Sequence, residues 1–298
     1  MNIFRHSSCS PLRRRLLLGG LAASAMPRLA AAQAVEPLRV VVSILPQKQF
    51  VERVAGNAAQ VEVLVRPGQS PATYDPTPAQ LVELGNAQVY FRIGVPFEAN
   101  WVPRFQSQFP KLRIVDTRQG IELAPMRGAD GQPAASGARD PHIWTSPRLV
   151  KRQAQTIRDA LIELAPAQRE AFEAGYTSYA AELDALDAEL RQTLAGKTQR
   201  RFMVFHPAWG YLARDYGLEM IPIEVEGKEP SPKALTALIE QARSLGVRVI
   251  FVQRQFSRTA AESGARAIGG EVVELNPLEE DFIGQARRAA AAIARGMV

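Results

Sequence analysis

Cysteine and histidine are scarce in this chain of 298 residues, which has one cysteine and three histidines. The cysteine, Cys9, lies within an N-terminal export signal and ahead of its apolar run, so it cannot be a lipid-acceptor cysteine at a cleavage site. The exported chain is therefore expected to have neither a thiol nor a disulfide. Any metal site in it has to use nitrogen and oxygen ligands.

Several catalytic signatures are also missing. The sequence has no HExxH pair, no G-x-S-x-G elbow and no glycine-rich loop that would hold a phosphate. Their absence, together with the absence of a cysteine nucleophile, speaks against a hydrolase. After residue 35 no apolar run is long enough for a transmembrane helix.

The first 34 residues are predicted to be an export signal. Basic residues without an acidic one precede the apolar run LLLGGLAASAM, and Ala32-Gln33-Ala34 supplies the small residues that a signal peptidase needs. Arg13-Arg14-Arg15 before leucines resembles a twin-arginine signal, with the general secretory route as the alternative. Either route predicts a periplasmic protein that is cleaved near Ala34.

The basic charge of the whole chain belongs largely to this signal. The sequence has 36 basic and 30 acidic residues, but five arginines and no acidic residue lie before Val35, which leaves 31 basic and 30 acidic residues. A nearly neutral exported chain gives no support to a role in binding nucleic acid or a membrane surface.

Short apolar runs alternate with amphipathic stretches in two parts of the chain. Strands are predicted within 38–45, 60–65, 88–94 and 112–117, and again within 202–206, 219–225, 247–253 and 271–276. This alternation is typical of parallel βα units. Between the two parts, a run of about thirty residues after Pro166 is rich in strong helix formers. We expect an α/β fold of two βα lobes with parallel sheets, joined by one long backbone helix. The expected parts are a signal at 1–34, an N-terminal lobe at 35–145, a helical linker at 146–197 and a C-terminal lobe at 198–298.

His142 and His206 are the two histidines outside the signal. His206 directly follows the strand predicted in RFMVFH, and ligands of parallel sheets gather at the carboxyl ends of strands. His142 lies in DPHIW between a loop rich in Gly, Ala and Pro and a helix expected to start near Ser146. One histidine in each lobe could close on a shared ligand, although each could also be a hydrogen-bonded ring in the core. The same alternatives apply to the flanking aromatics Trp144, Trp209, Tyr211 and Tyr216, which could wall a site or belong to the core.

Five stretches in order resemble the metal-binding substrate-binding proteins of zinc and manganese ABC importers. They are SILPQKQFVERVAG, RPGQSPATYDPTPAQL, DPHIW, FHPAWGYLARDYGL and EGKEPSP. The resemblance implies two α/β lobes on a long rigid helix, a divalent metal as the ligand, and the membrane permease of an ABC importer as the partner. It also implies a monomer that captures metal in the cleft between the lobes and catalyses no reaction.

The resemblance assigns metal ligands residue by residue. His142 and His206 match the second and third ligands of the family, and a histidine at the third place favours zinc over manganese. The first ligand histidine falls on Ala72, which cannot bind a cation, and the last ligand falls on Asn276, an uncharged donor. A histidine-rich loop common in zinc members is here a histidine-free loop near 124–139.

The remaining ligands are left open by these departures. Asp281 or Glu280 could take the place of Asn276, and the other candidates for a free position are Glu226, Glu229, Asp75 and Gln255. Asp140 is expected either to accept a hydrogen bond from His142 or to cap the following helix.

Two further functions remain possible on this sequence. With Ala72 and Asn276 in place of two ligands, the protein could bind a metal chelate or another small ligand. A chelatase-like enzyme is a second alternative, against which the export signal weighs.

Overall fold

The structure is a computed structural model that describes residues 36–127, 132–133, 136–224, 231–256 and 258–297. The predicted export signal lies outside the described residues, as do Glu226 and Glu229. No helix of the part of the chain that is described is both long and apolar enough to cross a membrane.

A parallel sheet of four strands organises the first lobe, in the order β2-β1-β3-β4. Its strands are β1 (Leu38–Ile44), β2 (Ala59–Val65), β3 (Val89–Arg92) and β4 (Arg113–Asp116). The helices between them are α1 (Leu45–Ala55), α2 (Pro78–Asn86) and α3 (Phe97–Gln108). Helix α2 begins in the PTP stretch, where Thr77 caps the helix and Pro78 opens it.

The second lobe repeats this arrangement with the order β6-β5-β7-β8. Its strands are β5 (Arg201–Val204), β6 (Glu219–Pro222), β7 (Val249–Val252) and β8 (Glu271–Glu274), and its helices are α6 (Gly210–Asp215), α7 (Pro232–Ser244), α8 (Arg258–Ile268) and α9 (Phe282–Gly296). All strand pairs of both sheets are parallel. Their buried strands are rich in Val, Ile and Phe, as expected for sheets covered on both faces.

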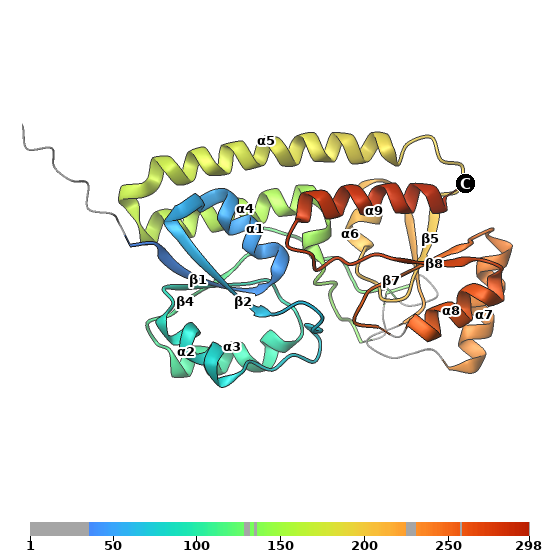
Figure 1. Cartoon of the computed structure of the whole chain (residues 1–298), viewed down its shortest axis with the longest axis horizontal. Coiled ribbons are helices and arrows are strands. Elements are labelled where there is room, and N and C mark those ends of the chain that lie inside the picture. Colours follow the sequence, from blue (N-terminus) through green and yellow to red (C-terminus); the bar gives the residue numbers. More distant parts are fainter. Residues whose placement is uncertain (1–35, 128–131, 134–135, 225–230, 257, 298) are drawn as a thin grey trace, which may run out of the picture. The chain divides into compact units, whose positions relative to one another are not determined.

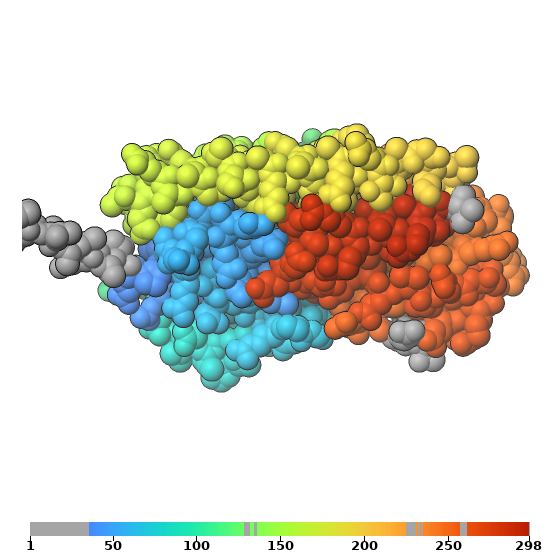
Figure 2. Space-filling model, turned by 45° about the horizontal axis from the view of Figure 1, so that its top comes forward, coloured from blue at the N-terminus to red at the C-terminus, as the bar shows by residue number. Residues whose placement is uncertain are grey.

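Two helices connect the lobes, α4 (Pro147–Leu164) and α5 (Arg169–Thr193). The long helix α5 contacts α4, α1 of the first lobe and α9 of the second (Figures 1 and 2). The predicted fold of two parallel βα lobes with a long connecting helix is confirmed. The helix has 25 residues rather than about thirty, because a 3-10 turn at Pro166–Gln168 precedes it. The predicted boundaries of the helical linker, after residue 145 and after residue 197, remain predictions.

Gly175 allows α5 to lie close to α1. A Cβ atom at this position would stand 2.3 Å from the carbonyl oxygen of Val54, which is backbone and cannot move aside cheaply. In a solvent-exposed helix, replacing glycine by alanine adds about 1 kcal/mol of stability. At Gly175 the clash outweighs that gain.

We therefore expect Gly175→Ala to destabilise the protein by about 1–3 kcal/mol, in the range of overpacked cores. Chemical denaturation measures the change, and Ser178→Ala on the exposed side of the same helix is the matched control. The control should stay within about 0.5 kcal/mol of wild type. A stabilised Gly175→Ala variant would show that α5 and α1 do not approach as closely as described.

Candidate metal centre

His142 and His206 face each other, with 3.3 Å between their Nε2 atoms. His142 directly precedes the 3-10 turn Ile143–Thr145, and His206 follows β5 by two residues. The His142 side chain is 9% exposed and that of His206 is 21% exposed. The structure thus brings together two of the three residues that the sequence predicts as metal ligands.

Each ring is held from behind by a carboxylate. Asp140 Oδ1 lies 2.7 Å from His142 Nδ1, and Glu224 Oε2 lies 3.0 Å from His206 Nδ1. A carboxylate only accepts hydrogen bonds, so we assign the proton of each neutral ring to Nδ1. The lone pairs of the two Nε2 atoms then point at each other, an unfavourable arrangement that a cation between them relieves.

The spacing of the two Nε2 atoms fits a shared zinc ion. Zinc takes histidine nitrogens at about 2.0–2.1 Å in a tetrahedral arrangement, which places two such nitrogens roughly 3.3–3.4 Å apart. The observed separation of 3.3 Å lies at this value. A histidine that binds a metal with one ring nitrogen and donates from the other to a carboxylate has a fixed ring orientation. The carboxylate also raises the basicity of the ligating nitrogen.

Electrostatics keep His206 in the form that binds metal. Burial lowers the pKa of His206 below its ordinary value, and the hydrogen bond to Glu224 opposes that shift only in part. A lowered pKa leaves the ring neutral at neutral pH, so the Nε2 lone pair is available to a cation.

Strand register explains why Glu224 reaches His206. The parallel strands β5 and β6 pair Val204 with Pro222, and each of the two site residues follows its strand by two positions. The backbone N–H of Glu224 also donates to Phe205 O at 2.8 Å, which continues the pairing beyond the strands. Glu224 is 2% exposed. Nothing in the local sequence singles out Glu224 from the neighbouring glutamates at 226 and 229.

Asp140 is positioned by contacts from the second lobe. Tyr211 in α6 donates its hydroxyl hydrogen to Asp140 O at 2.8 Å and accepts from Ala124 N at 3.0 Å. Gly210 leaves room for the carboxylate, since a Cβ atom there would stand 2.7 Å from Asp140 Oδ2. The expected hydrogen bond from Asp140 to His142 is confirmed. The cap of α4 is instead Ser146, whose Oγ accepts from Leu149 N at 3.2 Å.

The flanking aromatics divide between the two expected roles. Trp144 lines the cavity in front of the histidines and donates from Nε1 to Pro277 O at 2.9 Å. Phe256 also lines the cavity and stacks on His206, with ring centroids 4.7 Å apart. Trp209 and Tyr216 are buried in the main hydrophobic core.

The histidines open onto a cavity of about 750 Å³. Ala72, at the position that the resemblance assigns to the missing first ligand, lines the same cavity. The loop that carries it therefore reaches the site with a methyl group in place of an imidazole. Within the described residues, no group of three or more histidine, cysteine, aspartate or glutamate side chains could hold a metal ion together.

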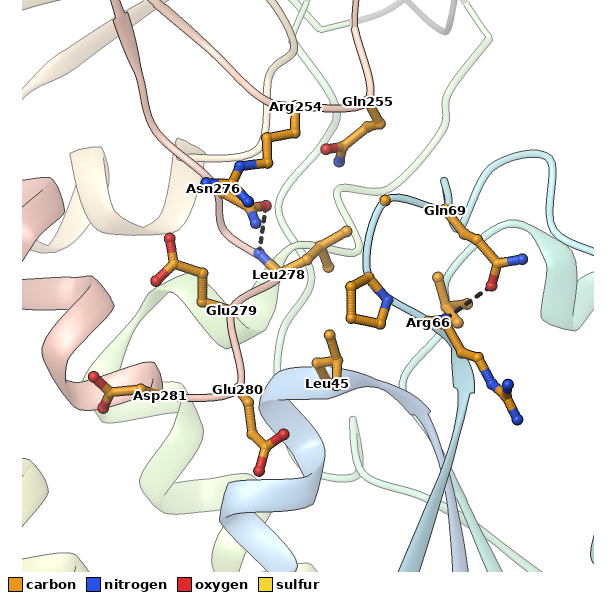
Figure 3. A pocket seen from close by; sticks show the side chains of 13 residues that line it. Leu45, Arg66, Gln69, Arg254, Gln255, Asn276, Leu278, Glu279, Glu280 and Asp281 are labelled. Carbon is orange, nitrogen blue, oxygen red and sulfur yellow. Dashed lines mark hydrogen bonds between the residues drawn. The ribbon is translucent and has the colours of Figure 1, made fainter.

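Asn276 lines a separate pocket of about 310 Å³, which Figure 3 shows. Its Oδ1 accepts a hydrogen bond from Leu278 N at 3.1 Å. Gln255 lines both this pocket and the histidine cavity. The structure does not place Asn276 among the residues lining the cavity in front of His142 and His206, and its role as a ligand stays a prediction.

The alternative carboxylates are engaged elsewhere. Glu280 lies 2.7 Å from Lys48 Nζ, Asp281 caps α9 by accepting from Gly284 N, and Asp75 accepts from Trp101 Nε1 at 2.7 Å. Glu226 and Glu229 lie outside the described residues. Their roles as ligands also stay predictions.

Comparison with known proteins agrees with this architecture. A crystal structure of ZnuA matches with a TM-score of 0.83 and 40% identity, over 88% of this chain and 100% of that chain. The crystal structure of a ZnuA deletion mutant with zinc bound matches with the same TM-score and 41% identity, over 88% of this chain and 98% of that chain. The high-affinity zinc uptake system protein ZnuA of Bacillus subtilis strain 168 is 28% identical over 82% of this chain and 79% of its own length. The zinc-binding lipoprotein AdcA of Streptococcus pneumoniae serotype 4 is 28% identical over 83% of this chain, which spans about half (51%) of that protein's length.

Two parallel-sheet lobes with paired, carboxylate-held histidines define a two-lobed α/β protein with a candidate metal centre. The model of the family described as zinc-uptake complex component A, periplasmic, matches residues 40–296. The chain belongs to this family.

Proposed function

We propose that this protein is a periplasmic solute-binding protein that captures a divalent transition metal, zinc in preference to manganese. It delivers the metal to the membrane permease of an ABC importer, acts as a monomer and catalyses no reaction. The observation that carries the proposal is the 3.3 Å approach of two Nε2 atoms whose rings are each held by a carboxylate. The names of the ZnuA and AdcA relatives, which refer to zinc uptake and zinc binding, support the choice of metal.

The residues of the chain divide the work of capture. His142 and His206 supply two nitrogen ligands, and Asp140 and Glu224 orient the rings and stabilise the positive charge that arrives. Asn276 is the third proposed ligand, an uncharged oxygen donor weaker than an imidazole, and the carboxylates at 226 and 229 are the alternatives. Imidazole nitrogens favour zinc over manganese, which prefers oxygen ligands.

Titration of the metal-free protein from residue 35 onward with zinc and manganese salts tests the proposal. We expect one saturable zinc site per chain and an affinity for manganese at least about tenfold weaker, a difference of about 1.4 kcal/mol. The absence of saturable binding for either metal, with or without an added small chelator, would contradict the proposed function.

A further inference from the structure

The residues that the structure describes supply few donors to a cation at the histidines. Glu224 lines the cavity, but its carboxylate contacts Nδ1 of His206, on the side of the ring opposite to Nε2. Ala72 stands where a third donor is expected, and the oxygen of Asn276 accepts from Leu278 N in the other pocket. Two imidazoles leave two positions of a tetrahedral zinc ion without a ligand from the described residues.

The cavity is much larger than a metal ion needs. Two waters that completed the shell would take up roughly 60 Å³, since a water molecule occupies about 30 Å³. The volume of about 750 Å³ falls instead within the 300–1,000 Å³ typical of pockets for small organic ligands. A bare ion would leave most of this space to bulk water.

The lining of the cavity combines apolar walls with two charged side chains, Glu224 behind His206 and Arg139. Apolar side chains cover much of the wall, among them Val95, Trp144, Phe256 and Leu278. Arg139 adds a fixed positive charge, because it lines the cavity and its side chain donates only to the uncharged backbone oxygen of Leu123 in the described structure. A guanidinium in this position favours a carboxylate on the incoming ligand.

From these observations we infer that the cargo is a zinc chelate, in which a small α-amino acid completes the coordination that His142 and His206 begin. The amine nitrogen and carboxylate oxygen of an α-amino acid close a five-membered chelate ring on zinc and fill the two remaining positions. The carboxylate is drawn toward Arg139, and the side chain of the amino acid occupies the rest of the cavity. This inference rests on the proposed function and names the form in which the metal is bound.

Native mass spectrometry of the metal-free protein separates bare zinc from the chelate, with L-histidine as the probe. When zinc and L-histidine are both added, we expect the ternary complex of protein, zinc and L-histidine to dominate the mass spectrum. In calorimetry, we expect the preformed 1:1 complex of zinc and L-histidine to bind the protein at least about tenfold more tightly than the zinc salt does. N-acetyl-L-histidine is the matched control, because its blocked amine cannot close the chelate ring. It should give no ternary complex.

Ala72→His is the matched protein variant, because it returns a third imidazole to the wall of the cavity. We expect it to bind the zinc salt at least about tenfold more tightly than wild type and to lose the ternary complex. If the wild-type protein binds the zinc salt tightly and L-histidine only competes for the zinc, the cargo is not a chelate, and the proposed function remains intact. If Glu226→Gln/Glu229→Gln then weakened that binding, the missing ligands would belong to those carboxylates. No binding in any form would contradict the proposed function itself.

Discussion

Replacing both histidines, as His142→Ala/His206→Ala, should abolish zinc binding while the fold remains intact. Sites with four protein ligands bind zinc with a free energy of about 10–16 kcal/mol, which corresponds to roughly 2.5–4 kcal/mol for each ligand. Losing two nitrogen ligands therefore weakens binding on the order of 10³-fold or more. Calorimetry with zinc, alone and as its L-histidine complex, measures the loss.

The single variants show whether the two rings act on one ion. If both bind the same zinc, His142→Ala and His206→Ala should each weaken binding on the order of 100-fold, and the stoichiometry should remain one site per chain. Asn276→Ala in the same series tests the third predicted ligand, whose uncharged amide should contribute less than either imidazole. Full zinc affinity in the double variant, with an unchanged circular dichroism spectrum, would place the metal elsewhere.

Glu224→Gln should move zinc affinity and the stability of the metal-free protein in opposite directions. Glu224 is buried, and its Oε1 has no hydrogen-bond partner in the described part of the chain. A buried carboxylate with an unsatisfied oxygen costs about 1–3 kcal/mol or more, so the uncharged amide should raise the melting temperature of the metal-free protein. The same change removes the negative charge behind His206 and should weaken zinc binding about 10–100-fold.

Glu219→Gln provides the matched control for this variant. Glu219 is the first residue of β6, the strand that Glu224 follows by two positions, but it is exposed and pairs with Arg201 at 2.7 Å. Its substitution should leave zinc affinity unchanged, because surface ion pairs contribute little and this one is remote from the histidines. Equal zinc affinity for Glu224→Gln and wild type would show that the carboxylate behind His206 does not assist binding.

The fold was accessible from the sequence because its strands are short, apolar and regularly spaced. All eight predicted strands occur in the described structure, each within or beside its predicted range. The long helix was recognisable from its composition, but its first turn was not. Pro166 lies in a run of good helix formers, and the chain forms a 3-10 turn there before α5 begins at Arg169.

The site was accessible only in part. His142 and His206 stand out because they are the only histidines outside the predicted signal, and the position of His206 after a strand places it at the edge where ligands gather. Glu224 is one of three glutamates in EVEGKE, and which of them faces His206 depends on the register between β5 and β6. Register is a property of the paired sheet, so the local sequence favoured the loop residues Glu226 and Glu229 instead.

Zinc K-edge X-ray absorption on the zinc-loaded protein tests the central claim most directly, because it reports the atoms around the metal. We expect two imidazole nitrogens from the protein at about 2.0–2.1 Å, and one imidazole fewer in each of the zinc-loaded single variants His142→Ala and His206→Ala. Loading in the presence of glycine, which has no imidazole, keeps the count of protein rings unambiguous. A zinc shell without imidazole scattering, or one that is the same in wild type and both single variants, would contradict a metal centre at these two histidines.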